Sequence, residues 1–382
     1  MHIDILYDPQ AAAASARRME AMFSLGMADR PPVIWGACPR MLLARRGSSF
    51  ARFFSDPVTQ ATEILLNHQW LAEHVPGDMV TGLTAGIQPQ FENVSNSQSL
   101  GAGVRWDDHQ PPQVLPCIHT VADLEAYEPP PLEGTLWQRM MDWHREMKAW
   151  LEGGGVTVTM RGEPVSVGLG LHIGGESPFC VAVDLCGALA YEWLVEAPEA
   201  MHRLLGLITD RMIEVERMMR RQTGEPERGT WFLTDDSAQI VSLRSYREFV
   251  APYSLRLYET FTGPGDKRVM HLCGNHAHLY PALVEDLRIS GIWGFGAPVA
   301  PEQARDAVGG RIWLVGNLDC SLLRDGPPDR IVAETRRLLD ALGPCGGLGV
   351  GDGYNLIPDT PLEHLRLVVD TVTQWAAALN RP

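Results

Sequence analysis

Short apolar runs alternate with longer amphipathic stretches along most of the chain. The short runs are rich in Val, Ile, Leu and Trp and end at Gly, Pro, Asn or Asp, which is typical of buried strands. The longer stretches repeat apolar residues at helical spacing. Strands are expected at residues 31–36, 78–83, 156–160, 165–169, 230–234, 267–272, 291–295, 311–315 and 347–350. Helices are expected at residues 56–73, 136–153, 181–186, 199–222, 245–261, 278–289, 301–308, 329–342 and 360–379.

Repeated strand–helix units predict parallel strands joined by crossover helices. We therefore expect an α/β fold, a (β/α)8 TIM barrel that spans residues 31–382 as one domain. Residues 1–30 are expected to form an N-terminal extension, and the Pro-rich residues 88–132 an insertion that covers the barrel mouth. A doubly wound open sheet is the alternative, but the sequence contains no convincing dinucleotide-binding turn and no phosphate-binding loop.

Composition and charge narrow the functional classes. The 382 residues, 45% of them hydrophobic, are ample for a core, and the formal net charge of −15 disfavours binding to nucleic-acid phosphates. Seven dispersed cysteines, an odd number in a large chain, fit a reducing compartment better than a disulfide scaffold. The chain begins without a basic, apolar leader and has no long uninterrupted apolar run, so we expect a cytoplasmic protein without membrane spans.

Polar residues cluster where the later strands are expected to end. In a (β/α)8 barrel, catalytic groups stand at the carboxyl ends of strands and converge on one mouth. These strand-end candidates are Asp235, Asp236, His271, Cys273, Asn317, Asp319, Asp352 and Tyr354.

His271 and Cys273 are two residues apart, so on a strand their side chains share one face. An imidazole and a thiol placed in this way can supply two protein ligands to a catalytic zinc ion. A buried cysteine beside a hydrogen-bonded histidine explains the same pattern, and the pair alone does not decide between them.

The other candidates also have two interpretations each. Asp235 and Asp236 point to opposite faces of a strand, so one can act as a general acid or base while the other caps a helix. Asn317 and Asp319 either orient a substrate or form the turn after the strand. Arg40, shortly after the first strand, is either an anion site or a surface arginine.

Several motifs, in order along the chain, resemble the uroporphyrinogen decarboxylase-like superfamily. The resemblance begins near residue 31 and is strongest after residue 229. The segments that carry it are Gly174–Phe179, Ser245–Tyr253, Arg268–Asn275 with its His-x-Cys-Gly-Asn element, Leu314–Asp319 and Ile357–Pro361.

The resemblance implies a (β/α)8 barrel and one of two chemistries. True uroporphyrinogen decarboxylases are metal-free and resemble one another in an Arg-rich N-terminal segment and in an aspartate at the end of the second strand. Here the segment Trp35–Arg40 retains one arginine, and residues 78–83 end without an aspartate. Porphyrinogen decarboxylation is therefore disfavoured.

The other branch contains the corrinoid-dependent methyltransferases and O-demethylase systems, in which His-x-Cys and a later cysteine bind zinc. In this chain, His271 and Cys273 match the first two ligands. Tyr354 and the asparagine after it stand where the third is expected, so Cys345, or else Asp352, is the candidate for that role. No cobalamin-binding signature occurs in the sequence, which implies that a corrinoid cofactor would be carried by a separate protein.

Three hypotheses follow from the sequence. The first is a zinc methyltransferase that acts on a small-molecule or thiol substrate and a corrinoid partner. The second is a metal-independent decarboxylase or lyase on the same barrel, and the third a non-catalytic binding protein. The resemblance to the superfamily implies that the protein forms a homodimer. The expected catalytic residues are Asp235, Asp236, His271, Asn317 and Tyr354, and the expected substrate-binding residues Trp35, Arg40, Asn275 and Asp319.

Overall fold

The central feature of the computed structural model is a six-stranded parallel sheet. The structure describes residues 1–82, 85–171 and 175–379. The strands lie in the order β13-β12-β11-β10-β9-β8, so that strands adjacent in the sheet are successive along the chain. They are β8 (Gly175–Glu176), β9 (Trp231–Thr234), β10 (Arg268–Leu272), β11 (Gly291–Phe295), β12 (Trp313–Leu318) and β13 (Leu348–Asp352).

Backbone contacts extend the sheet at its β13 edge. Val33 forms a parallel bridge with Val350, and the Asp78 backbone N–H donates a 2.7 Å hydrogen bond to the Val33 carbonyl. A separate two-stranded sheet pairs β7 (Val167–Leu169), which precedes β8 along the chain, in parallel with β2 (Ala85–Ile87). In the six-stranded sheet each strand lies beside its neighbour along the chain, which is the strand order of a (β/α)8 barrel and the order that the alternation of strands and helices predicts. Leu83 and Gly174, which the sequence analysis placed in a strand and a motif, lie outside the described residues.

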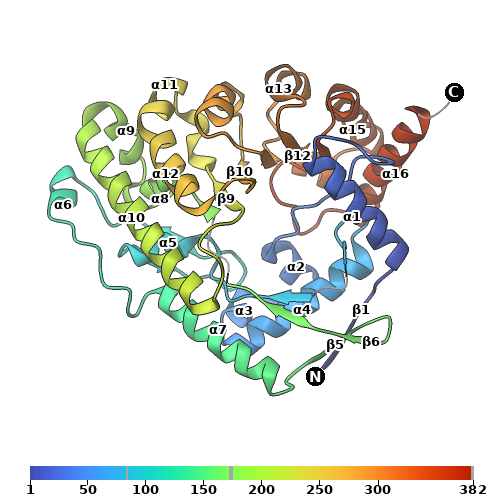
Figure 1. Cartoon of the computed structure of the whole chain (residues 1–382), viewed down its shortest axis with the longest axis horizontal. Helices are drawn as coiled ribbons and strands as arrows, with labels where there is room; N and C mark the ends of the chain where they lie inside the picture. Colours follow the sequence, from blue (N-terminus) through green and yellow to red (C-terminus); the bar gives the residue numbers. More distant parts are fainter. Residues whose placement is uncertain (83–84, 172–174, 380–382) are drawn as a thin grey trace.

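Helices follow the strands and surround the sheet, and Figure 1 shows α9 to α16 as an arc around β9 to β12. No single helix in the described part of the chain is long and apolar enough to cross a bilayer. The α-helices are α1 (Pro9–Phe23), α2 (Pro39–Arg45), α3 (Phe50–Phe53), α4 (Pro57–His74), α5 (Ser95–Ser99), α6 (Val121–Glu125), α7 (Leu136–Glu152), α8 (Pro178–Cys186), α9 (Leu189–Glu196), α10 (Pro198–Thr223), α11 (Leu243–Ser245), α12 (Ala251–Phe261), α13 (Pro301–Val308), α14 (Cys320–Asp325), α15 (Pro328–Leu342) and α16 (Leu362–Leu379). Short 3-10 or π turns are η1 (Glu92–Val94), η2 (Asp236–Ile240), η3 (Tyr246–Val250), η4 (Ala277–Leu279), η5 (Ala282–Asp286) and η6 (Gly343–Cys345).

A smaller sheet and a hairpin lie outside the barrel sheet. Residues 156–160 do form a strand, β5 (Thr157–Met160), but it pairs with β1 (His2–Ile5) and β6 (Glu163–Val165) instead of a barrel strand. Their apolar residues pack with those of α4 and α7 in a second hydrophobic cluster. Within residues 88–132, β3 (Gly103–Arg105) and β4 (Gln113–Leu115) form an antiparallel hairpin.

Along each barrel strand, successive side chains point alternately to the barrel interior and to the layer between the sheet and the helices. One set of alternate residues packs with the helices, and it includes Trp231, Leu233, Met270, Ile292 and Leu314. The intervening residues form a separate interior cluster, and they include Phe232, Val269, Trp293, Trp313 and Val315. Met19, Met22 and Phe23 of α1 belong to the same cluster. The N-terminal helix therefore fills the amino-terminal end of the barrel interior.

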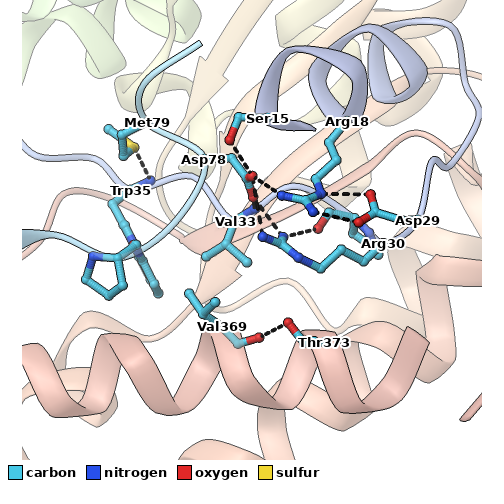
Figure 2. Close-up of polar contacts among 12 residues, drawn as sticks. Ser15, Arg18, Asp29, Arg30, Val33, Trp35, Asp78, Met79, Val369 and Thr373 are labelled. Carbon is cyan, nitrogen blue, oxygen red and sulfur yellow. Dashed lines mark hydrogen bonds and ion pairs between the residues drawn. The ribbon is translucent and has the colours of Figure 1, made fainter. Parts of the chain in front are cut away.

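Buried Asp78 ties this N-terminal segment to the barrel (Figure 2). It accepts hydrogen bonds of 2.8 Å from the Ser15 hydroxyl, from the guanidinium groups of Arg18 and Arg30, and from the Val33 backbone N–H. Burial works to raise the pKa of Asp78, but these donors outweigh it and hold the pKa below its ordinary value. The ionised carboxylate thus joins α1 to the segment around Val33, which forms a single β-bridge where the sequence predicts a whole strand at residues 31–36, and to the segment that begins at Asp78, whose described residues 78–82 form no strand.

Candidate metal and active site

Three potential metal ligands meet on the interior face at the carboxyl end of the barrel. His271 lies two residues beyond Val269, Cys273 lies two beyond His271, and Asp236 follows Phe232 by four. The two-residue period of β10 places His271 on the side of the interior cluster. Asp236 and Cys273 follow the ends of β9 and β10, and their contacts bring them to His271. Their nearest ligand atoms all lie within 4.8 Å of one another.

The environment of His271 fixes which ring nitrogen faces the site. Its Nδ1 lies 2.6 Å from the Trp293 carbonyl oxygen, which can only accept, so Nδ1 carries the proton. Nε2 is then an acceptor and lies 3.1 Å from Cys273 Sγ and 3.7 Å from an Asp236 carboxylate oxygen. A carbonyl behind a histidine, holding its second nitrogen free, is the usual arrangement of a metal-binding imidazole.

Asp236 and Cys273 are held together directly. The Cys273 backbone N–H donates a 2.6 Å hydrogen bond to Asp236 Oδ1, and the carboxylate side chain remains 39% exposed. Burial, followed by the Asp236 charge, raises the pKa of the Cys273 thiol well above its ordinary value. Without a cation the thiol is therefore protonated at neutral pH, and it can donate to His271 Nε2.

Asp235 points the other way, into the layer between sheet and helices. Its carboxylate is fully buried and accepts hydrogen bonds from the Ser177 hydroxyl at 2.6 Å and the Tyr246 hydroxyl at 3.0 Å. Burial raises the pKa of Asp235 to about 6 despite these two donors. Of the two adjacent aspartates, Asp236 therefore lies in the site, and Asp235 supports it from behind.

Asp352, at the end of β13, is buried beside the mouth. One carboxylate oxygen accepts a 2.7 Å hydrogen bond from the Gly36 backbone N–H, while the other is buried without a partner. Burial raises the pKa of Asp352, and the positive charge of a protonated His271 would lower it. Burial also raises the pKa of Tyr354, with a further contribution from Cys273. Both residues therefore lie at the same mouth as the ligand cluster.

Cys345 does not belong to this site, and its proposed role as the third zinc ligand is wrong. It lies before β13, where its Sγ would be 3.0 Å from a Cβ placed on Gly309, a residue that precedes β12. His271 and Cys273 are at the opposite, carboxyl end of the strands. At about 3.3 Å per residue, the length of β13 separates Cys345 from Asp352 by roughly 20 Å.

Two of the expected polar residues make contacts that hold the backbone around the mouth. Asn317 donates from its amide to the carbonyls of Gly296 at 3.1 Å and Val299 at 2.7 Å. Asp319 caps α14 by accepting from the backbone N–H groups of the second and third residues of that helix. The structure thus gives both residues positioning contacts.

The remaining candidates differ in their access to the mouth. Trp35 is buried and donates from its indole to the Pro76 carbonyl at 2.7 Å. Asn275 is exposed directly after the ligand loop, so it is available to a bound molecule. Arg40 lies in α2 and has a buried Nε without a hydrogen-bond partner. Its positive charge works to lower the pKa of Glu92, although burial of the Glu92 carboxylate raises that pKa to about 7.

Two residues near the site were missed by the sequence reasoning. Cys320 is buried at the first position of α14, and it immediately follows the strand-end residue Asp319. Glu176 ends β8, and burial, with the neighbouring carboxylate of Asp184, raises its pKa well above the ordinary value. Glu176 ends a strand and Cys320 lies two residues beyond one, so proximity to a strand end is the signal in the sequence that marks both.

Glycines allow the strand ends at the mouth to pack backbone against backbone. A Cβ on Gly296 would lie 2.0 Å from the Gly274 carbonyl oxygen, and one on Gly353 would lie 2.5 Å from the Ala297 nitrogen. The segments that follow β10, β11 and β13 are therefore in direct contact. This close packing draws the side chains of these strand ends toward one space.

Comparison with known proteins identifies the family. The Uroporphyrinogen decarboxylase (URO-D) family profile matches residues 91–375. A methylated-thiol–coenzyme M methyltransferase of Methanosarcina mazei is 26% identical over 337 residues, 82% of this chain and 83% of the relative. A uroporphyrinogen decarboxylase of Xanthomonas euvesicatoria is 28% identical over 285 residues, 72% of this chain and 75% of the relative.

A solved structure shows the same fold. A methyltransferase from Methanosarcina mazei superposes with a TM-score of 0.66 at 18% identity, covering 94% of this chain and 98% of the other. The relatives thus include a methyltransferase and decarboxylases, and the similarity to the first supports methyl transfer in general terms. The family profile covers most of the chain, and the chain is therefore a member of the uroporphyrinogen decarboxylase (URO-D) family.

Proposed function

We propose that this protein is a zinc-dependent methyltransferase that moves a methyl group between a small-molecule or thiol substrate and a corrinoid. The observation that supports it most is the cluster of Asp236, His271 and Cys273, whose ligand atoms lie within 4.8 Å of one another. The Trp293 carbonyl directs His271 Nε2 toward this cluster. One nitrogen, one sulfur and one oxygen donor suit zinc, and three protein ligands leave a position for substrate.

His271 and Asp236 control the proton of the Cys273 thiol, which must be lost before that sulfur can bind zinc. Before zinc binds, the Cys273 thiol donates to His271 Nε2, and both atoms become available as ligands when the thiol proton is lost. Asp236 holds the Cys273 backbone and is exposed enough to pass that proton to solvent. Bound zinc would ionise a substrate thiol that occupies its open position at neutral pH. The sulfur of that substrate would then accept or donate the methyl group.

The partners are part of the same proposal. The name of the Methanosarcina mazei relative includes a methylated thiol and coenzyme M, which suggests a thiol on one side of the reaction. The corrinoid would be carried by a separate protein that docks at the barrel mouth. A cytoplasmic homodimer is the setting that we propose for the reaction.

Zinc content is the first test. We expect about one zinc per chain in protein purified without chelator, and loss of that zinc in Cys273→Ser. Cys345→Ser is the matched control, because it makes the same change at the far end of the barrel and should leave the metal bound. Zinc-loaded protein should then demethylate a methylated thiol when a corrinoid protein is supplied.

A metal-independent lyase is the second candidate, because decarboxylases are also among the relatives. Asp236 and His271 would then exchange protons with a substrate, and Arg40, with its unpartnered Nε, would bind a carboxylate. If wild-type protein holds no zinc and takes none up on reconstitution, the methyltransferase proposal fails and this alternative replaces it.

A further inference from the structure

A cavity of about 620 Å³ lies between the helices α2 and α4 and the paired strands β2 and β7. Its volume is in the range of sites that bind small molecules. Its walls include the apolar side chains of Leu42, Ile64 and Leu71, and no described residue that lines it is an aspartate, a glutamate, a lysine or an arginine. None of the three potential metal ligands lines it, so this cavity is separate from the candidate metal site.

Two facing glycines form the floor of the cavity. Gly86 and Gly168 are register partners in the parallel pair of β2 with β7, and both of them are exposed and line the cavity. Paired strands lie about 4.8 Å apart, and without side chains their backbones present a flat surface. A flat molecule can therefore lie directly on the peptide groups of the two strands.

The usual structural reasons for glycine inside a strand do not apply to this pair. The register of β2 with β7 is regular, so neither glycine forms a bulge, and neither has a positive φ. Among the described residues, the nearest atom to an added Cβ is a carbonyl oxygen of the facing strand, at 4.0 Å for Gly86 and 3.7 Å for Gly168. Both distances are ordinary contacts. Glycine weakens a strand, and the reason that remains is the close approach of a ligand.

A buried amide in the wall of the cavity offers a hydrogen bond that the protein does not use. Asn67 lines the cavity and is 6% exposed, and its Oδ1 accepts a 2.6 Å hydrogen bond from Arg46. A guanidinium only donates, so this contact fixes the amide oxygen toward Arg46 and turns Nδ2 away from it. Nδ2 makes no hydrogen bond within the described part of the chain. A buried donor without an acceptor is unfavourable, and a bound molecule that supplies an acceptor would remove that cost.

His68 adds no charge to the cavity. Its Nε2 lies 2.9 Å from the Gly86 carbonyl oxygen, which can only accept, so Nε2 carries the proton and joins α4 to the floor. Burial lowers the pKa of His68, so the ring is neutral at neutral pH. An ion that entered the cavity would lose water without gaining a counter-charge from the described lining residues. The cavity therefore favours an uncharged molecule.

We propose that this cavity is a binding site for an uncharged aromatic molecule, whose ring lies on Gly86 and Gly168 and whose hydrogen-bond acceptor pairs with Asn67 Nδ2. The flat floor selects the ring, the apolar walls cover it, and the free amide selects a carbonyl or ether oxygen. This inference goes beyond the proposed function and does not depend on it, because the cavity shares no described residue with the metal cluster.

Three matched probes test the proposal on wild-type protein by ligand-observed NMR titration. Acetophenone, a neutral ring with one carbonyl acceptor, should bind saturably with a dissociation constant of about 1 mM or tighter. Cyclohexyl methyl ketone has the same acceptor on a ring that is not flat, and benzoate carries a charge. Both should bind at least about 10-fold more weakly, because one does not fit the flat floor and the other must lose its hydration. No saturable binding of acetophenone, or equal binding of all three probes, would overturn the proposal.

A substitution in the floor locates the bound ring. Gly168→Val should weaken acetophenone binding by at least about 10-fold, because the new side chain occupies the floor. Its thermal stability should equal or exceed that of wild type, since valine favours a strand and the added Cβ meets no close atom. Gly229→Val is the matched control, because Gly229 precedes β9 and an added Cβ there meets no described atom within 4 Å. Equal acetophenone affinity in the two variants would place the ring elsewhere and refute the assignment.

A nearly isosteric change tests the hydrogen bond. Asn67→Asp keeps an acceptor for Arg46 but removes both N–H groups of Nδ2, so the helix contact is preserved. Acetophenone affinity should fall by about 10-fold. Unchanged affinity would show that Asn67 does not recognise the carbonyl oxygen, and that part of the proposal would be wrong.

Discussion

At the scale of single residues, the candidate site depends on glycine behind His271. Gly294 has a positive φ of 80°, and a Cβ there would lie 2.5 Å from His271 Nδ1. The imidazole can lie against the β11 backbone and reach the Trp293 carbonyl only because this side chain is absent. The histidine that faces the ligand cluster is thus oriented by a residue with no functional group.

Gly294→Ala is therefore expected to weaken zinc binding by about 10- to 100-fold, because it displaces His271 from its supporting carbonyl. Zinc affinity, measured by chelator competition, checks this. Gly265→Ala is the matched control, since Gly265 also has a positive φ of 89°, but a Cβ added there would meet no heavy atom within 4 Å. Both should lose about 1–3 kcal/mol of stability from backbone strain. Equal zinc affinity in the two variants would contradict the role given to Gly294.

Asp235 gives a prediction for pH dependence. Its pKa is about 6 in the folded protein and 3.8 as the ordinary value, so between these pH values the native state binds a proton that the unfolded chain has released. The free energy of unfolding should therefore decrease as pH rises from about 4 to 6, by up to about 3 kcal/mol from this group. Denaturant unfolding of wild type and Asp235→Asn across this range isolates the effect. A wild-type-minus-variant difference that is flat with pH would show that Asp235 is not protonated on folding.

At the scale of elements, the contact of α1 with the barrel depends on one buried carboxylate. Arg18 reaches from α1 and Arg30 from the loop before the first strand, and both donate to Asp78 (Figure 2). Removal of Asp78 would leave two largely buried guanidinium groups without their shared counter-ion. Helix α1 would then be held mainly by its apolar contacts with the barrel interior.

Asp78→Ala is expected to lower the free energy of unfolding by about 3–5 kcal/mol, as when one partner of a buried ion pair is lost. Asp29→Ala is the control, because Asp29 also pairs with Arg18 but its side chain is 63% exposed. That change should cost no more than about 1 kcal/mol. Urea unfolding of both variants measures their free energies of unfolding. Similar decreases in the two variants would contradict the prediction that the buried carboxylate of Asp78 stabilises the protein more than the exposed one of Asp29.

The barrel elements show which parts of the fold the sequence could predict. The strands β9 to β13 and the helices between them follow directly from the apolar runs and helical periodicity. The pairing of β1 with β5 does not, because it joins His2 to Thr157 and no local pattern encodes so distant a contact. The apolar run at residues 156–160 predicts a strand, but it does not predict the partner of that strand.

The candidate site was predictable to a similar degree. The spacing of His271 and Cys273 was enough to place both side chains on one face. The choice between Asp235 and Asp236 was not available, since both faces of a buried parallel strand are apolar and the sequence does not mark the inner one. The sequence offers Cys345 as a third ligand because it lies close along the chain to the family motif, although it precedes β13 instead of following it.

At the scale of the whole molecule, the two ends of the barrel are different. The ligand cluster lies at the carboxyl end, and the apolar side chains of α1 occupy the interior at the amino-terminal end. Figure 1 shows α1 beside β12, where Met22 and Phe23 pack in the same cluster as Trp313 and Val315. A helix from the start of the chain thus packs against β12 and β13, two strands from its C-terminal part.

Because side chains of α1 fill the amino-terminal end of the barrel interior, substrates can reach the ligand cluster from one side only. A molecule that reacts at the ligand cluster must arrive and leave through the carboxyl-end opening, because Met19, Met22 and Phe23 occupy the opposite side. A small methyl donor or acceptor and a bulky protein-bound corrinoid would then both need the opening at the carboxyl end of the barrel. The small molecule would therefore have to enter before the corrinoid protein covers the opening, and it could leave only after that protein has withdrawn.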